Sequence, residues 1–424
     1  MTKDQPEGWS FLLFMTVDPR RYDKQKLNPF FRFHRFKESF FHLLGKLEKT
    51  TKIPEADMIK LQPVLIPRQL SLLIILSTGL LSHVMLIPDI LQAAGRDGWV
   101  SVLTAVPFLF LIILVIKYTI KNSPKGGMMR HILTQGRPVV RILFFTPICL
   151  FLFIGAYITF VDLVIWLQAY FLADVSRWLI MLLMGVSCFI FTWAGVKYMA
   201  VAAGLLLPIV MLLGIFIATT NTDMKDPSLL FPILSEGWSP VLKGSLYVLS
   251  GFMELYLILL LHPFSEGEFK LHHLLVLGLI LFILIMGPLS AAIMEFGPSE
   301  AASMRYPAYD QWRIMGIGEF ITHMDFFALY QWLCGALIRI GLFLFLLGSI
   351  LNCNLRSTRI SWKVVVPIYL MFFMIIWINV DTYHFYYALY HWFFPATVAF
   401  FSIYILATAC YARILAHRKR GGSS

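Results

Sequence analysis

The stretch YMAVAAGLLLPIVMLLGIFIATTNT, residues 198–222, contains no charged side chain. A helix needs about 20 apolar residues to cross the ~30 Å hydrocarbon core of a bilayer, so this stretch is long enough to span a membrane. The whole chain has the same character, because 58% of its 424 residues are hydrophobic and only 14% are charged. A soluble protein cannot bury that much apolar surface. The sequence therefore predicts an all-α polytopic membrane protein.

Ten apolar stretches are long enough to be transmembrane helices, which predicts a ten-helix, transporter-like membrane domain over residues 66–415. They cover residues 69–94, 98–117, 141–171, 176–196, 198–220, 243–264, 271–295, 325–352, 362–380 and 385–412.

An N-terminal extension, residues 1–65, precedes this domain, and a basic tail, residues 416–424, follows it. The extension is basic and interleaved with aromatic side chains. Its residues 28–50 fit two interpretations: a helix lying on an anionic membrane surface, or a soluble tail that is packed on the bundle or partly disordered.

The net charge of +11 is spread unevenly over the connections between spans. With both termini placed in the cytoplasm, 28 Lys and Arg residues fall on the inner side and six on the outer side. Without the N-terminal extension the ratio is still 15 to 6. This is the positive-inside asymmetry of membrane proteins, so the charge indicates orientation in a lipid bilayer and not nucleic-acid binding.

Ten spans divide into two halves of five, as in transporters built from inverted repeats whose first helices are broken at the midplane. The centres of the first and sixth spans carry Gly and Ser among bulky apolar residues, at 77–85 and 249–254. Both contain the pattern Leu-Ser-x-x-Met. Small residues there fit either an unwound helix that offers backbone groups to a ligand or close helix packing, which is common in lipid.

Three of the predicted spans carry an interior charge: Asp162, Glu254 and Arg339. With a rise of 1.5 Å per residue, Glu254 lies about 16 Å from the start of its span near Lys243. Arg339 lies about 20 Å from the start of its span near Phe326. Charges at that depth must be paired or hydrated. The two side chains are therefore expected either to form an ion pair that locks the helices or to hold the two ends of a zwitterionic ligand.

Other polar residues rank lower as site candidates. His83, near the centre of the first span, either relays protons or bonds a neighbouring carbonyl. Asp162 is expected near the outer face, Tyr157 could line a cavity, and Trp332 is interpreted as packing. The five cysteines are interpreted as small apolar packing residues: Cys149, Cys188, Cys334, Cys353 and Cys410.

The sequence lacks a Gly-rich phosphate loop, a metal-spaced His or Cys cluster, and a nucleophile with a base at useful spacing. No enzymatic activity, metal or cofactor is predicted.

Three stretches resemble a known family. They are residues 66–70 leading to 94–99, residues 229–234 and 244–245 leading to 263–264, and residues 318–320 leading through 325 and 332 to 338–339. Together they resemble the B subunit of GerA-type spore germinant receptors, the endospore germination permease family, over most of residues 66–415. The motif Arg-Asp-x-Trp at 96–99 is the sharpest part of the likeness.

This resemblance implies the amino acid–polyamine–organocation transporter superfamily, with a LeuT-like five-plus-five inverted repeat and broken helices 1 and 6. It implies the inner membrane of the spore, partner A and C subunits, and a small nutrient, typically an amino acid, held between spans 1, 3, 6 and 8. The ligand-binding residues that it implies here are Ser77, Thr78, Gly79, Ser82, Tyr157, Gly251, Glu254, Arg339 and Gly341.

Two departures from the family pattern stand out. The N-terminal extension is longer than expected, and Gly341 stands where a small hydroxyl residue would donate a hydrogen bond to the nutrient.

The function that follows is nutrient binding in a midplane pocket, with a conformational change passed to the partner subunits. The alternative is a secondary amino acid transporter coupled to H⁺ or Na⁺, in which Glu254 or His83 carries the proton. A third interpretation is a structural subunit without a ligand of its own.

Overall fold

The computed structural model describes residues 65–316, 324–377 and 381–421, and side chains up to residue 417. The N-terminal extension, with both interpretations of residues 28–50, the resemblance at residues 318–320 and the last three residues lie outside these ranges.

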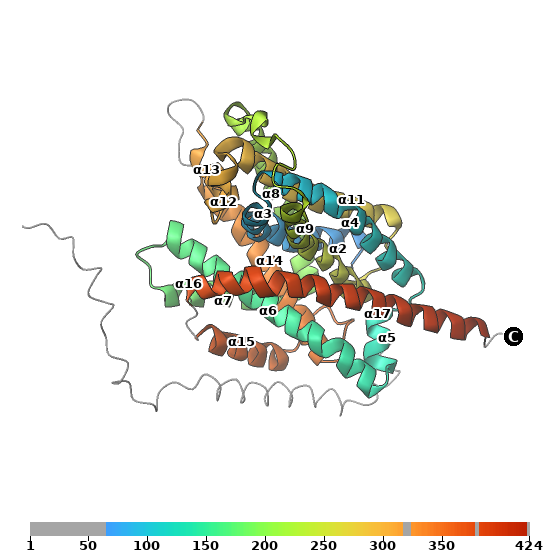
Figure 1. Cartoon of the computed structure of the whole chain (residues 1–424). Helices are drawn as coiled ribbons and strands as arrows, with labels where there is room; N and C mark the ends of the chain where they lie inside the picture. Colours follow the sequence, from blue (N-terminus) through green and yellow to red (C-terminus); the bar gives the residue numbers. More distant parts are fainter. Residues whose placement is uncertain (1–64, 317–323, 378–380, 422–424) are drawn as a thin grey trace, which may run out of the picture. The chain divides into compact units, whose positions relative to one another are not determined.

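The described residues are folded almost entirely into helices (Figure 1). In chain order these are α2 (Pro67–Leu80), η2 (Leu81–Met85), α3 (Leu86–Ala94), η3 (Gly95–Asp97), α4 (Gly98–Lys121), α5 (Met128–Gln135), α6 (Pro138–Tyr170), α7 (Arg177–Ala194), α8 (Val196–Thr220), η4 (Asn221–Met224), η5 (Pro227–Leu230), α9 (Trp238–Met253), η6 (Glu254–Tyr256), α10 (Leu257–Leu261), η7 (His262–Phe264), α11 (Leu271–Phe296), α12 (Pro298–Ser303), α13 (Pro307–Ile314), α14 (Phe326–Leu351), α15 (Trp362–Ile376), α16 (Thr382–Ala388), η8 (Leu389–Phe393) and α17 (Phe394–Gly421).

Eight helical segments among the described residues are long and apolar enough to cross a membrane. The first of them, Pro67–Lys121, has 55 residues and is interrupted by the short turn η3, so it contains two of the predicted spans. The helix α15 has 15 residues, fewer than the length that a membrane crossing usually needs. An all-α polytopic membrane protein is confirmed, whereas the count of ten spans and the inverted repeat stay predictions.

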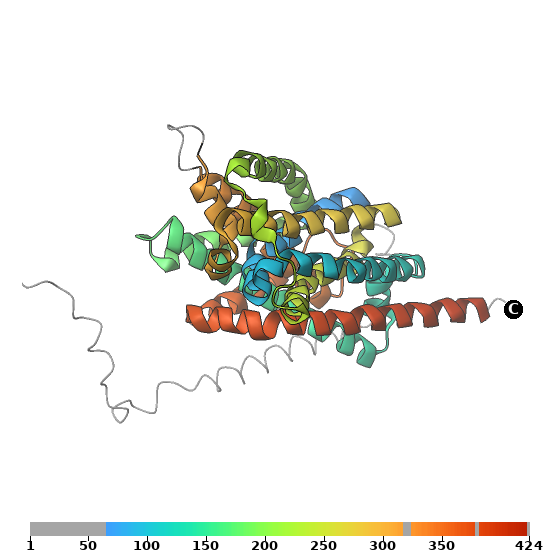
Figure 2. The same ribbon diagram turned by 45° about the horizontal axis from the view of Figure 1, so that its top comes forward.

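Burial separates central helices from peripheral ones. In the most apolar part of Trp238–Phe264 and of Phe326–Leu351, 89% of the residues are buried inside the protein, against 22% in Val196–Met224. The helix α14 packs against α2, α6, α7 and α8, so it runs through the middle of the bundle (Figure 1). At the periphery, α17 is a long helix whose C-terminal end extends beyond its neighbours (Figure 2).

Contacts between connections define two ends of the bundle. At one end, Leu65 pairs with Ser265 in an isolated β-bridge, so the first helix begins beside the connection that follows η7. At the other end, the Asp97 carboxylate accepts a hydrogen bond from the Leu234 backbone at 2.9 Å, which joins η3 to the 221–237 connection. Leu65 and Asp97 therefore mark the two ends of the first membrane helix, and the orientation of these ends in the membrane stays a prediction.

The predicted breaks in the first and sixth spans take a different form from the one expected. The first span forms a π-helical turn at Leu81–Met85, and the sixth a 3₁₀ turn at Glu254–Tyr256. The backbone at the ends of both turns stays right-handed helical, so no extended segment separates the two halves. These are changes of helix type, which often mark functional positions, and not full breaks.

The cysteines are mostly where the sequence places them. Cys149, Cys188, Cys334 and Cys353 are buried, as expected of small packing residues. Cys410 is exposed, so its assignment as a packing residue was wrong.

Candidate ligand-binding site

The two charges predicted at similar depth meet in the centre of the bundle. Glu254 opens the turn η6, and Arg339 lies in the middle of α14. The guanidinium of Arg339 donates two hydrogen bonds to the Glu254 carboxylate, from Nη1 to Oε2 at 2.6 Å and from Nη2 to Oε1 at 2.5 Å. Both side chains are only 1% exposed. This bidentate geometry is the strongest form of charge-assisted hydrogen bonding, which offsets part of the desolvation of both groups.

The remaining donors of Arg339 also find partners. Its Nε donates to the Thr159 hydroxyl on α6 at 3.0 Å, and its Nη1 lies 3.4 Å from the Ser77 carbonyl on α2. The ring of Phe343 lies 4.4 Å from the guanidinium carbon, at the distance of a cation–π contact. Arg339 thus joins α2, α6, η6 and α14 at one point. Sequence reasoning missed Thr159 and Phe343, because neither residue type is unusual in a membrane helix.

Three buried hydroxyls lie on the first span, at and just after Ser77, whose carbonyl is near Arg339. The side-chain oxygens of Ser77, Thr78 and Ser82 have no hydrogen-bond partner among the described residues. All three side chains are fully buried. A buried polar group without a partner costs about 1–3 kcal/mol, and Ser or Thr in a helix can usually bond the carbonyl four residues earlier. These unused groups are therefore available to a polar ligand.

The glycine predicted in the sixth span brings two helices together. A Cβ added to Gly251 would lie 2.6 Å from Leu86 Cδ1 and 3.4 Å from Ser82 Oγ. Glycine lets α9 approach η2 and α3 this closely without displacing the Leu86 side chain, one turn before Glu254. Ser77, Ser82, Gly251, Glu254 and Arg339 therefore share one polar centre.

Two predicted site residues lie elsewhere. Tyr157 on α6 lines a void of about 10 Å³, which holds at most one water, together with Arg177 and Met181 of α7. Gly341 on α14 faces α7 and α8: its carbonyl accepts a hydrogen bond from Thr192, and its added Cβ would lie 3.2 Å from Met199 Sδ. Both residues contact α7 or α8 here rather than the Glu254–Arg339 pair, so their assignment to a ligand-binding site stays a prediction.

Gly79 and His83 lie on a different face of the first span from the ion pair. They line a cavity of about 320 Å³ that is bounded mainly by α2, α8, α11 and α14. Trp332, interpreted from sequence as packing, also lines this cavity and stacks on Trp166 with ring centres 4.1 Å apart.

A second cluster of charges lies towards the end of the bundle that contains η3. Arg305, in the connection between α12 and α13, has its Nη2 atom 3.5 Å from Asp162 and its Nη1 atom 3.7 Å from Asp89. The hydroxyls of Tyr306 and Tyr386 donate to the same Asp162 oxygen at 3.1 and 2.9 Å. Arg305 therefore ties α3, α6 and α16 to the α12–α13 connection.

Electrostatics in this cluster favour the charged guanidinium. Burial disfavours the charge on Arg305, but the carboxylates of Asp162 and Asp89 outweigh it, so the pKa of Arg305 lies above its ordinary value. Its guanidinium also stacks over the Tyr386 ring at 3.6 Å.

Asp162 lies towards the η3 end of the bundle and is 2% exposed, so it is buried in this polar cluster. Asp89 lies within the first predicted span and is 5% exposed, although it was not counted among the interior charges.

Comparison with known proteins gives two matches. A family model described as "Spore germination protein" matches residues 65–384. Spore germination protein XB of Bacillus anthracis is 35% identical to the chain over 360 residues, which cover 83% of this chain and 98% of that protein.

Proposed function

Because the chain belongs to the spore germination permease family, we propose that it is the membrane subunit of a germinant receptor that binds an amino acid at the Glu254–Arg339 centre. The observation that carries this proposal is a buried bidentate ion pair that meets the first span at the Ser77 carbonyl, in a part of that span where three buried hydroxyls have no partner among the described residues. A purely structural lock gives no role to those hydroxyls.

The chemistry of the site suits a zwitterion. The ammonium group of an amino acid would bind the Glu254 carboxylate, and its carboxylate would take the two Nη donors of Arg339. The hydroxyls of Ser77, Thr78 and Ser82 would supply further hydrogen bonds. Insertion replaces one ion pair by two, so the charges stay balanced at a depth where an unpaired charge is costly.

Ligand entry requires the pair to separate, which links binding to a conformational change. Glu254 lies on η6 and Arg339 on α14, so a ligand between them moves the sixth span relative to the eighth. The Arg305 cluster joins Asp162 of α6 to α3 and α16, and α6 also carries Thr159, which accepts a hydrogen bond from Arg339, so the cluster would open in the same transition. A ligand that binds the open arrangement better shifts the population towards it.

The wider receptor follows from the family. We propose that the domain has ten spans in a five-plus-five inverted repeat, that both termini are cytoplasmic, and that it lies in the inner membrane of the spore. The A and C subunits would detect the rearrangement and pass it on. The alternation of contacts along the described helices supports this topology: Leu65 meets Ser265 at one end, and Asp97 meets Leu234 at the other.

One observation favours the alternative, a proton-coupled amino acid transporter. His83 lines the cavity beside α11, with the Leu284 carbonyl as a hydrogen-bond partner of its ring, and its Nδ1 atom has no partner among the described residues. A titratable ring in that position could accept a proton during transport.

The test uses the single variants Glu254→Gln and Arg339→Met, with Arg313→Met as the matched control. Arg313 also forms an ion pair, to Asp310 at 3.0 Å, but its side chain is 56% exposed. We expect both site variants to lose nutrient-triggered germination of spores at normal protein levels, and the control to keep it. An unchanged response in both site variants rules out the proposed site. Accumulation of labelled amino acid in proteoliposomes would favour the transporter.

A further inference from the structure

The cavity of about 320 Å³ beside the first span is separate from the ion pair and has a different chemical character. Its walls are stripes of apolar residues and glycine on facing helices. On α8 the stripe includes Leu207, Val210, Met211 and Gly214, spaced three and four residues apart, so it forms one face of that helix. On α11 the matching stripe runs from Ile283 to Met294.

The cavity is elongated along the helix axes. Its lining on α11 runs from Ile283 in the middle of the helix to Glu295, 12 positions further along and near the helix end. At 1.5 Å per residue this is about 18 Å. The hydrocarbon layer of one leaflet is about 15 Å deep, half of the ~30 Å core. The slot therefore runs from one membrane interface to about the midplane.

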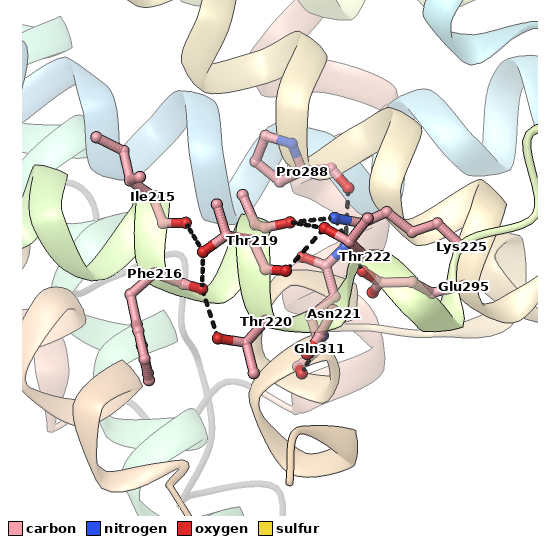
Figure 3. Close-up of polar contacts among 11 residues, drawn as sticks. Ile215, Phe216, Thr219, Thr220, Asn221, Thr222, Lys225, Pro288, Glu295 and Gln311 are labelled. Atoms are coloured by element: carbon pink, nitrogen blue, oxygen red, sulfur yellow. Dashed lines mark hydrogen bonds and ion pairs between the residues drawn. The ribbon is translucent and has the colours of Figure 1, made fainter. Parts of the chain in front are cut away.

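Polar residues gather at the interfacial end of the slot (Figure 3). Lys225 lies 3.7 Å from Glu295 and donates a hydrogen bond to the Ala218 carbonyl at 2.6 Å. Gln311 donates to the Pro288 carbonyl at 3.2 Å, and its own carbonyl accepts from Asn221 at 3.0 Å. The 3.7 Å separation is too long for a hydrogen bond, and the Lys225 side chain is 15% exposed, so its ammonium can still bind a ligand.

The slot opens sideways between α8 and α11. These helices share few contacts with each other, since α8 packs on α2 and α14 and α11 packs on α4 and α2. Ile215 and Ile283, on the cavity lining, are 58% and 51% exposed. The neighbouring surface of α8 is apolar, as at Leu212, which is 65% exposed. In a membrane this surface faces lipid, so the opening leads to acyl chains.

We propose that this slot is a binding site for one acyl chain of a membrane lipid, whose polar headgroup lies beside Lys225 and Gln311. The length, the apolar walls and the polar interfacial end match such an amphiphile. A zwitterionic nutrient fits poorly, because its charged groups would face apolar side chains over most of the slot. The bound acyl chain would touch Gly79 and Leu80 of α2. Lipid binding at this site does not depend on the proposed nutrient site.

Two glycines of the lining allow the slot to be filled. An added Cβ at Gly214 or at Gly287 would have no neighbour within 4 Å, so the space beside each is open. The double variant Gly214→Leu, Gly287→Leu places two side chains where the acyl chain would lie. The control is Gly204→Leu on the same helix, outside the lining, where an added Cβ makes an ordinary contact to Leu72 at 4.0 Å.

The experiment reconstitutes the full chain in nanodiscs with a phosphatidylethanolamine that carries a diazirine in the middle of one acyl chain. After photolysis, mass spectrometry compares labelling of Met211 and Leu284 in the slot with labelling of the exposed Leu212 and Leu279. We expect stronger labelling in the slot and a fall of about tenfold there in the double variant, equal to about 1.4 kcal/mol of binding free energy. Labelling of Leu212 and Leu279 should not change, and Gly204→Leu should behave as the unchanged protein.

Native mass spectrometry of the unchanged protein gives a second measurement that needs no variant. We expect one phospholipid to stay bound after the bulk lipid is exchanged for detergent. Even labelling of slot and surface, an undiminished signal in a folded double variant, or no retained lipid would each overturn the proposal. The proposal would also be overturned if the lipid probe left the slot unlabelled while an apolar nutrient bound there, since the occupant would then be the nutrient.

Discussion

Replacing Glu254 and Arg339 by methionine, singly and together, tests the central ion pair most directly. In Glu254→Met, the guanidinium loses both of its hydrogen bonds to the carboxylate and keeps only Thr159 and the Ser77 carbonyl. Arg339→Met leaves a buried carboxylate whose two oxygens have lost these donors. Removing one partner of a buried ion pair costs roughly 3–5 kcal/mol, so we expect each single variant to lose about that much stability.

The double variant should behave differently. Two methionines fill a similar volume with flexible apolar side chains and leave neither charge unpaired. Replacement of a buried pair by apolar residues is often close to neutral, so the double variant should be more stable than either single variant. A double-mutant cycle from reversible unfolding in mixed detergent micelles then gives a coupling energy of several kcal/mol. Additive single effects below about 1 kcal/mol would refute a desolvated pair.

The same three variants separate a structural lock from a ligand site. If the pair only joins η6 to α14, the double variant restores stability and nutrient-triggered germination together. If Glu254 and Arg339 bind the nutrient, the double variant restores stability while germination stays lost. We expect the second outcome, measured on spores whose receptor levels are matched by immunoblot.

Three further predictions concern positions around this centre. Gly251→Ala should lower the free energy of unfolding by about 1–3 kcal/mol in the same assay, because the added Cβ would lie 2.6 Å from Leu86 Cδ1. An unchanged unfolding midpoint would show that α9 and α3 are farther apart. Arg305→Gln leaves Asp89 and Asp162 without their cation, so hydrogen exchange of α12 and α13 should become faster, whereas Arg313→Gln should leave it as it is. The Asp381 carboxylate accepts hydrogen bonds from the backbone N–H groups of His384 and Tyr383, which lower its pKa. A lowered pKa stabilises the start of α16 above the ordinary aspartate pKa, and this contribution is lost as the pH falls through the lowered value. The protection factors of the Tyr383 and His384 amides, which correct for the slower intrinsic exchange in acid, should therefore fall on acidification, but not in Asp381→Asn, and an equal fall in that variant would contradict the cap.

Hydropathy determined the helices well, because a membrane helix must be apolar over nearly its whole length. The predicted span 271–295 matches α11, Leu271–Phe296, and the span 325–352 matches α14, Phe326–Leu351. Depth was equally readable, since it follows from counting residues at a fixed rise. That count is why Glu254 and Arg339 were expected to meet, as they do.

The direction in which a side chain faces was not readable in the same way. Tyr157 and Thr159 lie two residues apart on α6, which separates their side chains by about 200° around the helix. Thr159 therefore reaches Arg339 while Tyr157 faces α7. When a helix is apolar on all sides, a single sequence does not show which of its sides faces which neighbouring helix. For the same reason the sequence did not show that Gly341 faces α7 and α8.

Features that depend on several elements at once were also beyond the sequence. Arg305 lies in a connection, and only the fold brings it to two carboxylates on separate helices. The cavity arises from the divergence of α8 and α11, which no local pattern records. Asp89 was readable in principle, because it is a charge inside the first apolar stretch of the sequence.

The π turn at Leu81–Met85 has a genetic consequence. A π turn accommodates one residue more than an α turn, so the first membrane helix carries the equivalent of a single inserted codon. Deleting one codon within it should close the turn into a regular α-helix and leave Asp89 directed at Arg305. The same deletion one turn earlier, within Leu73–Leu76, would rotate everything that follows by about 100° and separate them. Between these two positions, a one-residue deletion should thus be tolerated at the π turn, where the extra residue already rotates the second half of the helix relative to the first.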